Sequence, residues 1–229
     1  NSKKNIQVKE TQQPEPKKNL VDHSEFGEIE IVEMPRVKRL AAPLLSESWR
    51  TIPHVTHHDE ADVTELENFR KNLKDGYTGE QKKITPLAFI IKALVKSMMK
   101  YPIFNSSIKD EENYQIILKK YFHIGIAVDT PHGLMVPKIR DADKFKISDL
   151  SQKLKEVSDK CRNLKIDKKE FQGGSITITS LGGIGGKFFT PIINPPEVAI
   201  LGIGKIFQKD KSDKLILPLS LSYDHRIIN

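Results

Sequence analysis

The sequence has little cysteine and no long apolar run, and each shortage removes a class of protein. A single cysteine, Cys161, cannot form an internal disulfide, which excludes a small disulfide-stabilised domain and favours a reducing compartment. No apolar run approaches the ~20 residues that a membrane helix needs, and no signal peptide is visible. We therefore expect a soluble intracellular protein that does not enter a membrane.

Charge is abundant but is not gathered in one place. The formal net charge is +7 and the pI is about 9.3, values that would suit a polyanionic partner. However, the lysines are spread along the whole chain, without a long basic run or a nucleic-acid motif. We therefore expect no nucleic-acid partner. Most lysines should lie on solvated faces, and some are available to attract a phosphorylated cofactor.

The first residues differ in composition from the rest of the chain. Residues 1–25 contain almost no large apolar side chains and are rich in Lys, Gln, Glu, Asn and Pro. Such a segment cannot bury enough surface to offset the entropy of ordering it, which predicts a flexible linker between domains. Residues 26–229 are enough for one large domain with a sizeable core. Because the chain begins at Asn1 and not at methionine, we expect it to be a piece of a longer protein.

Hydrophobic periodicity predicts that this domain mixes helices with strands. Three helix starts have capping signals: a capping box of Thr64 and Glu67, Thr85 before Pro86, and Ser148. The predicted helices are 37–50, 64–74, 85–101 and one from 148, and the predicted strands are 28–33, 103–108, 116–118, 122–128, 134–136, one from about 198, and 217–223. The apolar stripe of the last helix includes Cys161, which we expect to be a buried core residue.

Two stretches have residue types that suit a ligand but lack the spacing that a ligand needs. His54, His57 and His58 lie near two aspartates, yet no known zinc spacing is met, and in a strand His57 and His58 would face opposite sides. The glycines of 173–186 match neither the dinucleotide nor the P-loop spacing, and glycines after a strand more often mark backbone bends. We predict no metal site, and no cofactor-binding residue is assigned.

The last predicted strand leads directly to a candidate for acid–base chemistry. Residues 217–223 alternate apolar and small polar side chains, and His225 follows, flanked by Asp224 and Arg226. Histidine is the one side chain half-titrated near neutral pH, although a lone histidine is more often a core or surface residue. The role of His225 therefore has to be inferred from the residues around it.

These surroundings resemble a known family. Residues 223–229, Tyr-Asp-His-Arg-Ile-Ile-Asn, look like the signature of the dihydrolipoamide acyltransferases, which share a fold and a catalytic histidine with chloramphenicol acetyltransferase. In those families an Asp or Asn stands four residues after the histidine, as Asn229 does here, and the glycine that follows lies beyond the end of this chain. Further family phrases run in order from Met34 onwards, although His58 replaces an aromatic residue.

The resemblance implies a fold, an activity and an assembly. The fold is of the α/β (α+β) class, a chloramphenicol acetyltransferase-like two-layer mixed-sheet sandwich with flanking helices. The activity is acetyl transfer between S-acetyldihydrolipoyl-lysine and coenzyme A, in the core of a pyruvate dehydrogenase complex in the bacterial cytoplasm. Coenzyme A is a substrate, and the lipoyl group is carried by a lipoyl domain outside this chain. The expected partners are two further copies in a homotrimer, a larger cubic core built from such trimers, the lipoyl domains and the dehydrogenase components.

The same resemblance suggests which residues do the chemistry. His225 is the expected general base, and the hydroxyl of Thr179, where the family has serine, is the expected oxyanion donor. Asn229 and Arg36 are expected to pair and hold the catalytic loop, with Asp224 and Arg226 in support. Within one subunit we expect Thr179 and His225 to lie too far apart for one site, so that two subunits would build it. The family pattern also implies a final helix and strand after Asn229, without which apolar surface would be exposed.

Three other interpretations remain open. The acyl group could be succinyl or branched-chain, although the wording of residues 53–66 and 191–201 looks like that of pyruvate-complex enzymes. The domain could be a free chloramphenicol-type O-acetyltransferase, which an assay with dihydrolipoamide against chloramphenicol would distinguish. It could also be a structural core that has lost catalysis, an interpretation that the presence of both His225 and Thr179 argues against.

Overall fold

The computed structural model describes residues 21–74, 77–209 and 212–229. Contacts divide the chain into two units, Asn1–Glu33 and Met34–Asn229. The described part of the first unit contains a short 3-10 helix, η1 (His23–Phe26), and then continues without regular structure. The strand predicted over 28–33 is therefore wrong: these residues have the alternation of a strand, but they are not assigned to any sheet within the described ranges. Most of the predicted linker lies outside the described residues.

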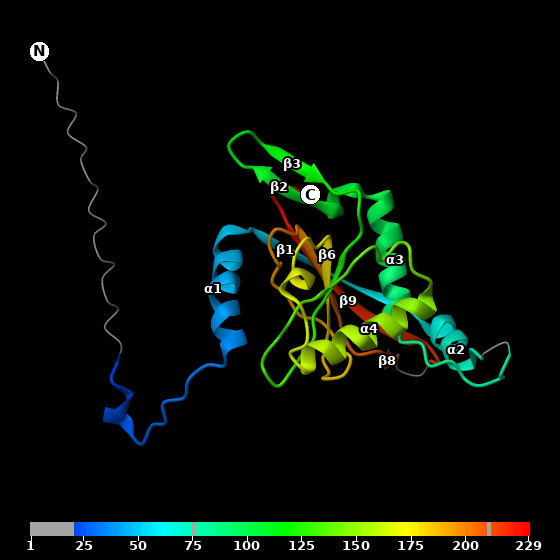
Figure 1. Ribbon diagram of the computed structural model, residues 1–229, viewed down its shortest axis with the longest axis horizontal. Coiled ribbons are helices and arrows are strands. Elements are labelled where there is room, and N and C mark those ends of the chain that lie inside the picture. The colour runs from blue at the N-terminus through cyan, green and yellow to red at the C-terminus, as the bar shows by residue number, and fades with distance from the viewer. Residues whose placement is uncertain (1–20, 75–76, 210–211) are drawn as a thin grey trace, which may run out of the picture. The chain divides into compact units, whose positions relative to one another are not determined.

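The second unit is built on a mixed sheet of seven strands (Figure 1). The path through it is β1 (His54–Asp62), β9 (Leu215–Asp224), β7 (Ala199–Ile203), β6 (Ile176–Ser180), β4 (Ile124–Ile126) and β5 (Lys138–Ile139), with β8 (Phe207–Gln208) also pairing with β9. Strands β4, β6 and β7 run parallel to one another, whereas β9 runs antiparallel to both of its long neighbours, β7 and β1. The carboxyl ends of β6 and β9 therefore lie at opposite ends of the sheet.

Helices flank this sheet, in agreement with the predicted fold class. They are α1 (Arg36–Thr51), α2 (Thr64–Asn72), α3 (Pro86–Lys100) and α4 (Ile147–Arg162). Buried side chains of α3 and α4, such as Ile91 and Leu150, form the main core with Ile176 and Ile178 of the central strand. A separate hairpin of β2 (Ser106–Asp110) and β3 (Gln115–Leu118) directly follows the short 3-10 helix η2 (Pro102–Asn105). A further 3-10 helix, η3 (Lys168–Phe171), follows α4.

The predicted helices all form, but two of their predicted caps do not. Thr64 is not an N-cap, because the carboxylate of Asp62 accepts both the Thr64 backbone N–H (3.1 Å) and its hydroxyl (2.6 Å). Ser148 lies inside the first turn of α4, which begins one residue earlier. Thr85 does cap α3, accepting from the Leu87 N–H at 3.4 Å. None of the helices in the described ranges is long and apolar enough to span a bilayer.

Cys161 is fully buried on α4, as its place in the apolar stripe predicted. Burial raises the pKa of its thiol, so that the reactive thiolate form is disfavoured. The residue therefore belongs to the core.

Candidate active site

Thr179 and His225 lie at opposite ends of the sheet. Thr179 is next to the last residue of β6 and is paired with Gly202 of β7, which is paired in turn with Ser220 of β9. His225 follows β9 and is five positions beyond Ser220. At ~3.4 Å per residue, these positions place the two residues about 17 Å apart along the strand direction alone. One chain therefore does not bring the two predicted catalytic residues together.

His225 is held by its backbone and leaves its ring exposed. Its N–H donates to the Pro53 carbonyl at 3.1 Å, which fixes the start of the final turn against the segment between α1 and β1. Its ring lies edge-on to the Tyr223 ring, with the centroids 6.0 Å apart. No side chain in the described ranges hydrogen-bonds to the imidazole, so both ring nitrogens are open to a group from outside the chain. This is the arrangement that a base awaiting a substrate would have.

Asp224 and Arg226 stabilise the turn that carries His225. The Asp224 carboxylate is buried and accepts from the backbone N–H of Arg226 at 3.0 Å and from its Nη2 at 2.7 Å. Arg226 Nη1 also donates to Glu111 Oε1, at the tip of the β2–β3 hairpin, at 2.8 Å. These carboxylates raise the pKa of the Arg226 guanidinium, chiefly through the bond to Asp224. Neither residue contacts the imidazole through a hydrogen bond, so their geometry fits a supporting role.

Arg36 is not near Asn229 within one chain. Arg36 opens α1, and its neighbour Val37 packs on the loop after β4, where a Cβ on Gly133 would lie 3.2 Å from Val37 Cγ1. That loop is at the same end of the sheet as Thr179, because β4 and β6 are parallel. The helix then runs about 24 Å, at ~1.5 Å per residue, to the segment that holds His225 (Figure 1). Arg36 and exposed Asn229 therefore lie at opposite ends as well.

The two expected pairs are thus separated in the same way. One end of the unit carries Thr179 and Arg36, and the other carries His225 and Asn229. The expected pairing of Arg36 with Asn229 is not formed inside one chain, for the same reason that Thr179 and His225 do not meet. A contact between two copies that joined the two ends would bring both pairs together at once.

Thr179 is half-buried and its hydroxyl is available. No residue in the described part of the chain forms a hydrogen bond with this hydroxyl. Its neighbour in β7, Gly202, leaves room for an aromatic ring: a Cβ there would lie 2.7 Å from Phe189 Cζ. The glycine therefore lets Phe189 pack closely against the sheet beside Thr179.

The histidine-rich segment is structural in its geometry. The Ile193 N–H donates to His54 Nε2 at 2.9 Å, and His54 Nδ1 lies 2.8 Å from the Ile52 carbonyl, so both ring nitrogens are used by the backbone. His57 lies beside the Tyr223 ring and His58 beside the Phe188 ring, 6.0 and 5.1 Å between centroids. No group of metal-ligating side chains is found among the residues that the structure describes.

A buried ionic network was missed by the sequence analysis. Lys138 forms an ion pair with Glu197, both side chains being 1% exposed, and the Thr177 hydroxyl donates to Glu197 Oε2 at 2.6 Å. Lys119 lies nearby and donates to the Gly174 carbonyl at 2.8 Å; burial lowers its pKa to about 8. The signal in the sequence was a charged residue inside an apolar strand context, Val-Pro-Lys-Ile at 136–139. The network joins β5, β6 and the segment before β7.

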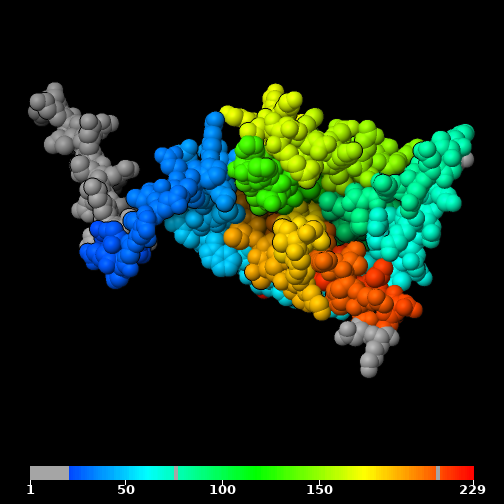
Figure 2. Space-filling model, turned by 90° about the horizontal axis from the view of Figure 1, so that it is seen from below, coloured from blue at the N-terminus to red at the C-terminus, as the bar shows by residue number. Residues whose placement is uncertain are grey.

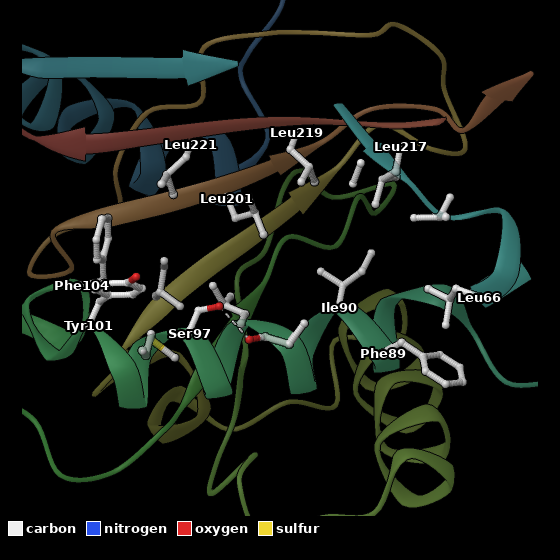
Figure 3. Close-up of a pocket in the computed structure, with 16 residues that line it drawn as sticks. Leu66, Phe89, Ile90, Ser97, Tyr101, Phe104, Leu201, Leu217, Leu219 and Leu221 are labelled. Carbon is white, nitrogen blue, oxygen red and sulfur yellow. Dashed lines mark hydrogen bonds between the residues drawn. The ribbon is translucent and has the colours of Figure 1, made fainter. Parts of the chain in front are cut away.

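A large apolar hollow lies away from all of these groups, between α3 and the β9 side of the sheet (Figure 3). It measures about 650 Å³. Leu217, Leu219 and Leu221 point into it from β9, and Ile90 and Ser97 face them from α3. None of its lining residues is an acid, a base or a histidine. It therefore offers no acid–base chemistry.

Comparison with known proteins places this geometry in a family. The family model for the 2-oxoacid dehydrogenases acyltransferase (catalytic domain) matches residues 26–229. The chain belongs to this family. A relative of this acyltransferase domain in Haemophilus influenzae, the dihydrolipoyllysine-residue acetyltransferase component of the pyruvate dehydrogenase complex, is 50% identical over 218 residues. These cover 91% of the chain and 38% of that relative, so the acyltransferase domain spans well under half of its length.

Solved structures give the same assignment for the fold of this acyltransferase domain. Two solved structures each have a TM-score of 0.87 and 44% identity to this chain. One is Azotobacter vinelandii dihydrolipoamide acetyltransferase, from work on the roles of a serine, a histidine and an asparagine in its catalytic mechanism. The other is the cubic core of a pyruvate dehydrogenase multienzyme complex. In both, the match covers 93% of this chain and 90% of the other. A chloramphenicol acetyltransferase has a TM-score of 0.53 at 11% identity, covering 82% of this chain and 86% of its own, which supports the predicted fold alone.

Proposed function

We propose that this acyltransferase domain moves an acetyl group between a dihydrolipoyl-lysine thiol and coenzyme A, in the core of a pyruvate dehydrogenase complex. The observation that carries the proposal is the placement of His225 and Asn229 at one end of the sheet, with Thr179 and Arg36 at the other. The histidine and asparagine named for the Azotobacter vinelandii enzyme are four positions apart, the spacing of His225 and Asn229. The function of the Haemophilus influenzae relative supports the choice of reaction.

The chemistry follows from the nucleophile. A thiol with a pKa near 8.5 attacks poorly, so His225 takes its proton as the sulfur forms a bond to the thioester carbonyl carbon. The carbonyl oxygen becomes an oxyanion, and the Thr179 hydroxyl donates a hydrogen bond to it. When the intermediate collapses, the bond to the first sulfur breaks, and His225 returns the proton to that sulfur. Atoms and charge balance, and the imidazole is regenerated.

The two ends of the sheet complete one site when copies of the chain assemble. In a homotrimer, His225 of each subunit faces Thr179 of a neighbour, and the same contact brings Asn229 to Arg36. Since asparagine is neutral, that pairing is a hydrogen bond to a guanidinium and not a salt bridge. The surface of α1 supports assembly, because Leu40 and Leu44 on one side of the helix and Trp49 on another are all more than 60% exposed. Such apolar residues are suited to a subunit interface.

The wider partners follow from the same proposal. Trimers assemble into a larger core, for which the solved cubic core at 44% identity is the support, and this core receives lipoyl domains and dehydrogenase components. Residues 1–25 serve as the linker to such domains. The protein works in the bacterial cytoplasm, a location that its single cysteine and its bacterial relatives support.

Acetyl is preferred over succinyl and branched-chain groups because the relatives quoted above are acetyltransferases of pyruvate dehydrogenase complexes. A spectrophotometric assay tests both the reaction and this preference. Acetyl-CoA and succinyl-CoA are each offered with dihydrolipoamide, and acetyl-CoA is offered with chloramphenicol. We expect rapid transfer of acetyl to dihydrolipoamide, slow transfer of succinyl and none to chloramphenicol. Faster use of succinyl-CoA would reassign the acyl group, and transfer to chloramphenicol alone would reject the proposed reaction.

A further inference from the structure

The turn that carries His225 is linked to a second element, the tip of the β2–β3 hairpin. Glu111 Oε1 at this tip accepts from Arg226 Nη1 at 2.8 Å, across 115 positions of the chain. Strands β2 and β3 form a two-stranded sheet of their own. Figure 1 shows the hairpin beside the C-terminus, whereas Figure 2 views the other end of the unit, where the loop that follows β6 lies at the surface in golden yellow. The ion pair therefore joins the hairpin to the His225 end of the main sheet.

Two carboxylates hold the guanidinium of Arg226 from two sides. Asp224 accepts from Nε through Oδ1 at 3.0 Å and from Nη2 through Oδ2 at 2.7 Å, along one edge of the planar group. Glu111 takes Nη1, which lies off that edge. The side chain of Asp224 is 3% exposed and that of Arg226 is 33% exposed. Because a buried carboxylate without its partner is costly, Asp224 depends on Arg226 staying in place.

The backbone of the hairpin tip is fixed before the ion pair forms. Asp110 Oδ1 accepts from the backbone N–H groups of Glu112 at 3.0 Å and Asn113 at 3.1 Å, and its Oδ2 accepts from the Asn113 side chain at 2.7 Å. An exposed ion pair is usually worth little, because ordering two long side chains offsets the attraction. Here the guanidinium is already ordered by its buried partner and the tip by Asp110. Only the side chain of Glu111, 70% exposed, remains to be ordered.

The base of the hairpin and the His225 turn are fixed to the same segment of the chain. The Ser107 hydroxyl donates to the Pro196 carbonyl at 2.5 Å, and the Asp224 backbone N–H donates to the Val198 carbonyl at 2.9 Å. The ion pair of Glu111 closes a ring of contacts through the hairpin, this segment and the turn. Since a two-stranded hairpin is marginally stable by itself, these anchors determine where its tip lies.

We propose that Glu111 is a positioning residue for the general base His225. The inference rests on the proposed function, in which His225 takes the proton of the attacking thiol. Glu111 holds Arg226, Arg226 holds the buried carboxylate of Asp224, and Asp224 begins the turn whose next residue is His225. Proton transfer needs hydrogen-bond distance, so a displacement of the base by ~1 Å lowers the rate strongly. Glu111 therefore acts on the chemical step and not on the binding of either thiol.

Steady-state kinetics of the full chain in its assembled form tests this role. Glu111→Ala removes the carboxylate, and Glu111→Gln keeps an acceptor oxygen but removes the charge. The matched control is Glu112→Gln, which removes the same charge from the next residue of the tip; Glu112 is exposed and its side chain forms no ion pair within the described ranges. A double-mutant cycle with Arg226→Lys isolates the pair, because an ammonium lacks the fork that holds two carboxylates. Urea unfolding of each variant measures stability separately.

We expect Glu111→Ala to lower kcat about threefold to tenfold, as fits one charge-assisted hydrogen bond, and Glu111→Gln to lower it less. The KM for coenzyme A, the KM for dihydrolipoamide and the Glu112→Gln control should change less than about twofold, and the urea midpoint should stay close to that of the parent. Raising the salt from about 0.1 to 1 M should narrow the difference in kcat between parent and Glu111→Ala. In the Arg226→Lys background the effect of Glu111→Ala should be smaller.

Four results overturn the positioning role of Glu111. They are an unchanged kcat in Glu111→Ala, a rise in KM alone, the same loss in Glu112→Gln, and a full loss that persists with Arg226→Lys. A fall in kcat that merely follows a fall in the free energy of unfolding would assign Glu111 to stability. If the parent chain itself transfers no acetyl group to dihydrolipoamide, the proposed function fails, and that failure is distinct from any of these.

Discussion

Thr179 and His225 lie about 17 Å apart along the strand direction, at opposite ends of one sheet. Thr179 is level with Ser220 of β9, and His225 is five residues further along, at ~3.4 Å per residue. The antiparallel direction of β9 relative to β7 and β6 causes this separation, because it carries the chain away from Thr179 as it approaches His225. Side-chain motion covers only a few ångströms, so a single chain cannot close the gap without breaking the sheet. The proposed reaction therefore requires a second copy.

Mixing two inactive variants tests that requirement. His225→Ala should lower the transfer rate by about 10²–10⁴, the usual effect of losing a general base, and Thr179→Ala should impair the other half of the site. Trimers assembled from both variants contain some interfaces with two intact halves, so activity should return partly after subunit exchange. Exchange is followed by mass spectrometry, and size by sedimentation. An active monomer, or exchange without any recovery, would reject the shared site.

Thr179 is predicted to act mainly in the transition state. Thr179→Ala should lower kcat by about 10²–10³ with little change in KM, because an oxyanion donor binds the intermediate more strongly than the substrate. Thr179→Ser keeps the hydroxyl and should keep most of the rate, which makes it the matched control. Steady-state kinetics separates the two constants. If Thr179→Ala raised KM alone, Thr179 would be a residue that positions substrate.

The contact between Arg36 and Asn229 is predicted to form between subunits. Asn229→Asp should strengthen it by about 1–2 kcal/mol, because the hydrogen bond becomes a charge-assisted pair. The gain should vanish when Arg36→Ala is present, and a double-mutant cycle on the dissociation of the assembly measures the coupling. Arg39→Ala, one turn along α1, serves as the control. Equal effects of Asn229→Asp with and without Arg36 would mean that the two residues do not meet.

Glu197 is predicted to be essential for stability and not for the chemistry. Glu197→Ala leaves Lys138 buried without its partner, a change that typically costs about 3–5 kcal/mol. Replacing Lys138 by methionine at the same time should recover part of the loss, since no ammonium then remains at that position. Urea unfolding monitored by circular dichroism gives both values. A loss below 1 kcal/mol for the single variant would show that water reaches the site.

Lys119 should make stability depend on pH in the alkaline range. Burial lowers its pKa from 10.5 to about 8, so between these values the unfolded chain holds a proton that the folded chain has lost. Stability should therefore rise with pH from about 8 to 10.5 on account of this group, and the full cost of burying its charge is present below pH 8. Lys119→Met removes this slope. The test compares urea unfolding of parent and variant at several pH values; parallel curves would contradict the assignment.

Most of the fold could be predicted from the sequence because each main helix or strand buries one face, which leaves a periodic pattern of apolar residues. The alternation over 217–223 becomes β9, whose leucines face α3, and the helical stripes around Ile91 and Leu150 form the core. The failures are local. Residues 28–33 alternate but join no sheet in the part of the chain that the structure describes, and Asp62 replaces Thr64 as the group that stabilises the start of α2. Periodicity reports burial, whereas these two outcomes depend on neighbours that periodicity does not reveal.

The family resemblance supplied the candidate residues and the expectation that Thr179 and His225 lie apart within one subunit. Composition and periodicity alone did not give this separation, because it depends on the register of β9 against β7, which is a long-range pairing. The pair of Lys138 and Glu197 joins residues 59 positions apart and leaves only a weak trace in the sequence. Such a charge cluster becomes visible only when the strands are packed.

We expect the apolar hollow beside β9 to make the purified chain sensitive to salting-out. Sulfate is excluded from protein surfaces and so strengthens the burial of apolar side chains. Leu219 and Leu221 would then be covered by whatever apolar surface is at hand, including the same hollow of another molecule. Precipitation at low ammonium sulfate, with circular dichroism unchanged on redissolving, would accordingly report that the hollow is empty. A higher ammonium sulfate concentration for precipitation would then indicate that another apolar group covers the hollow.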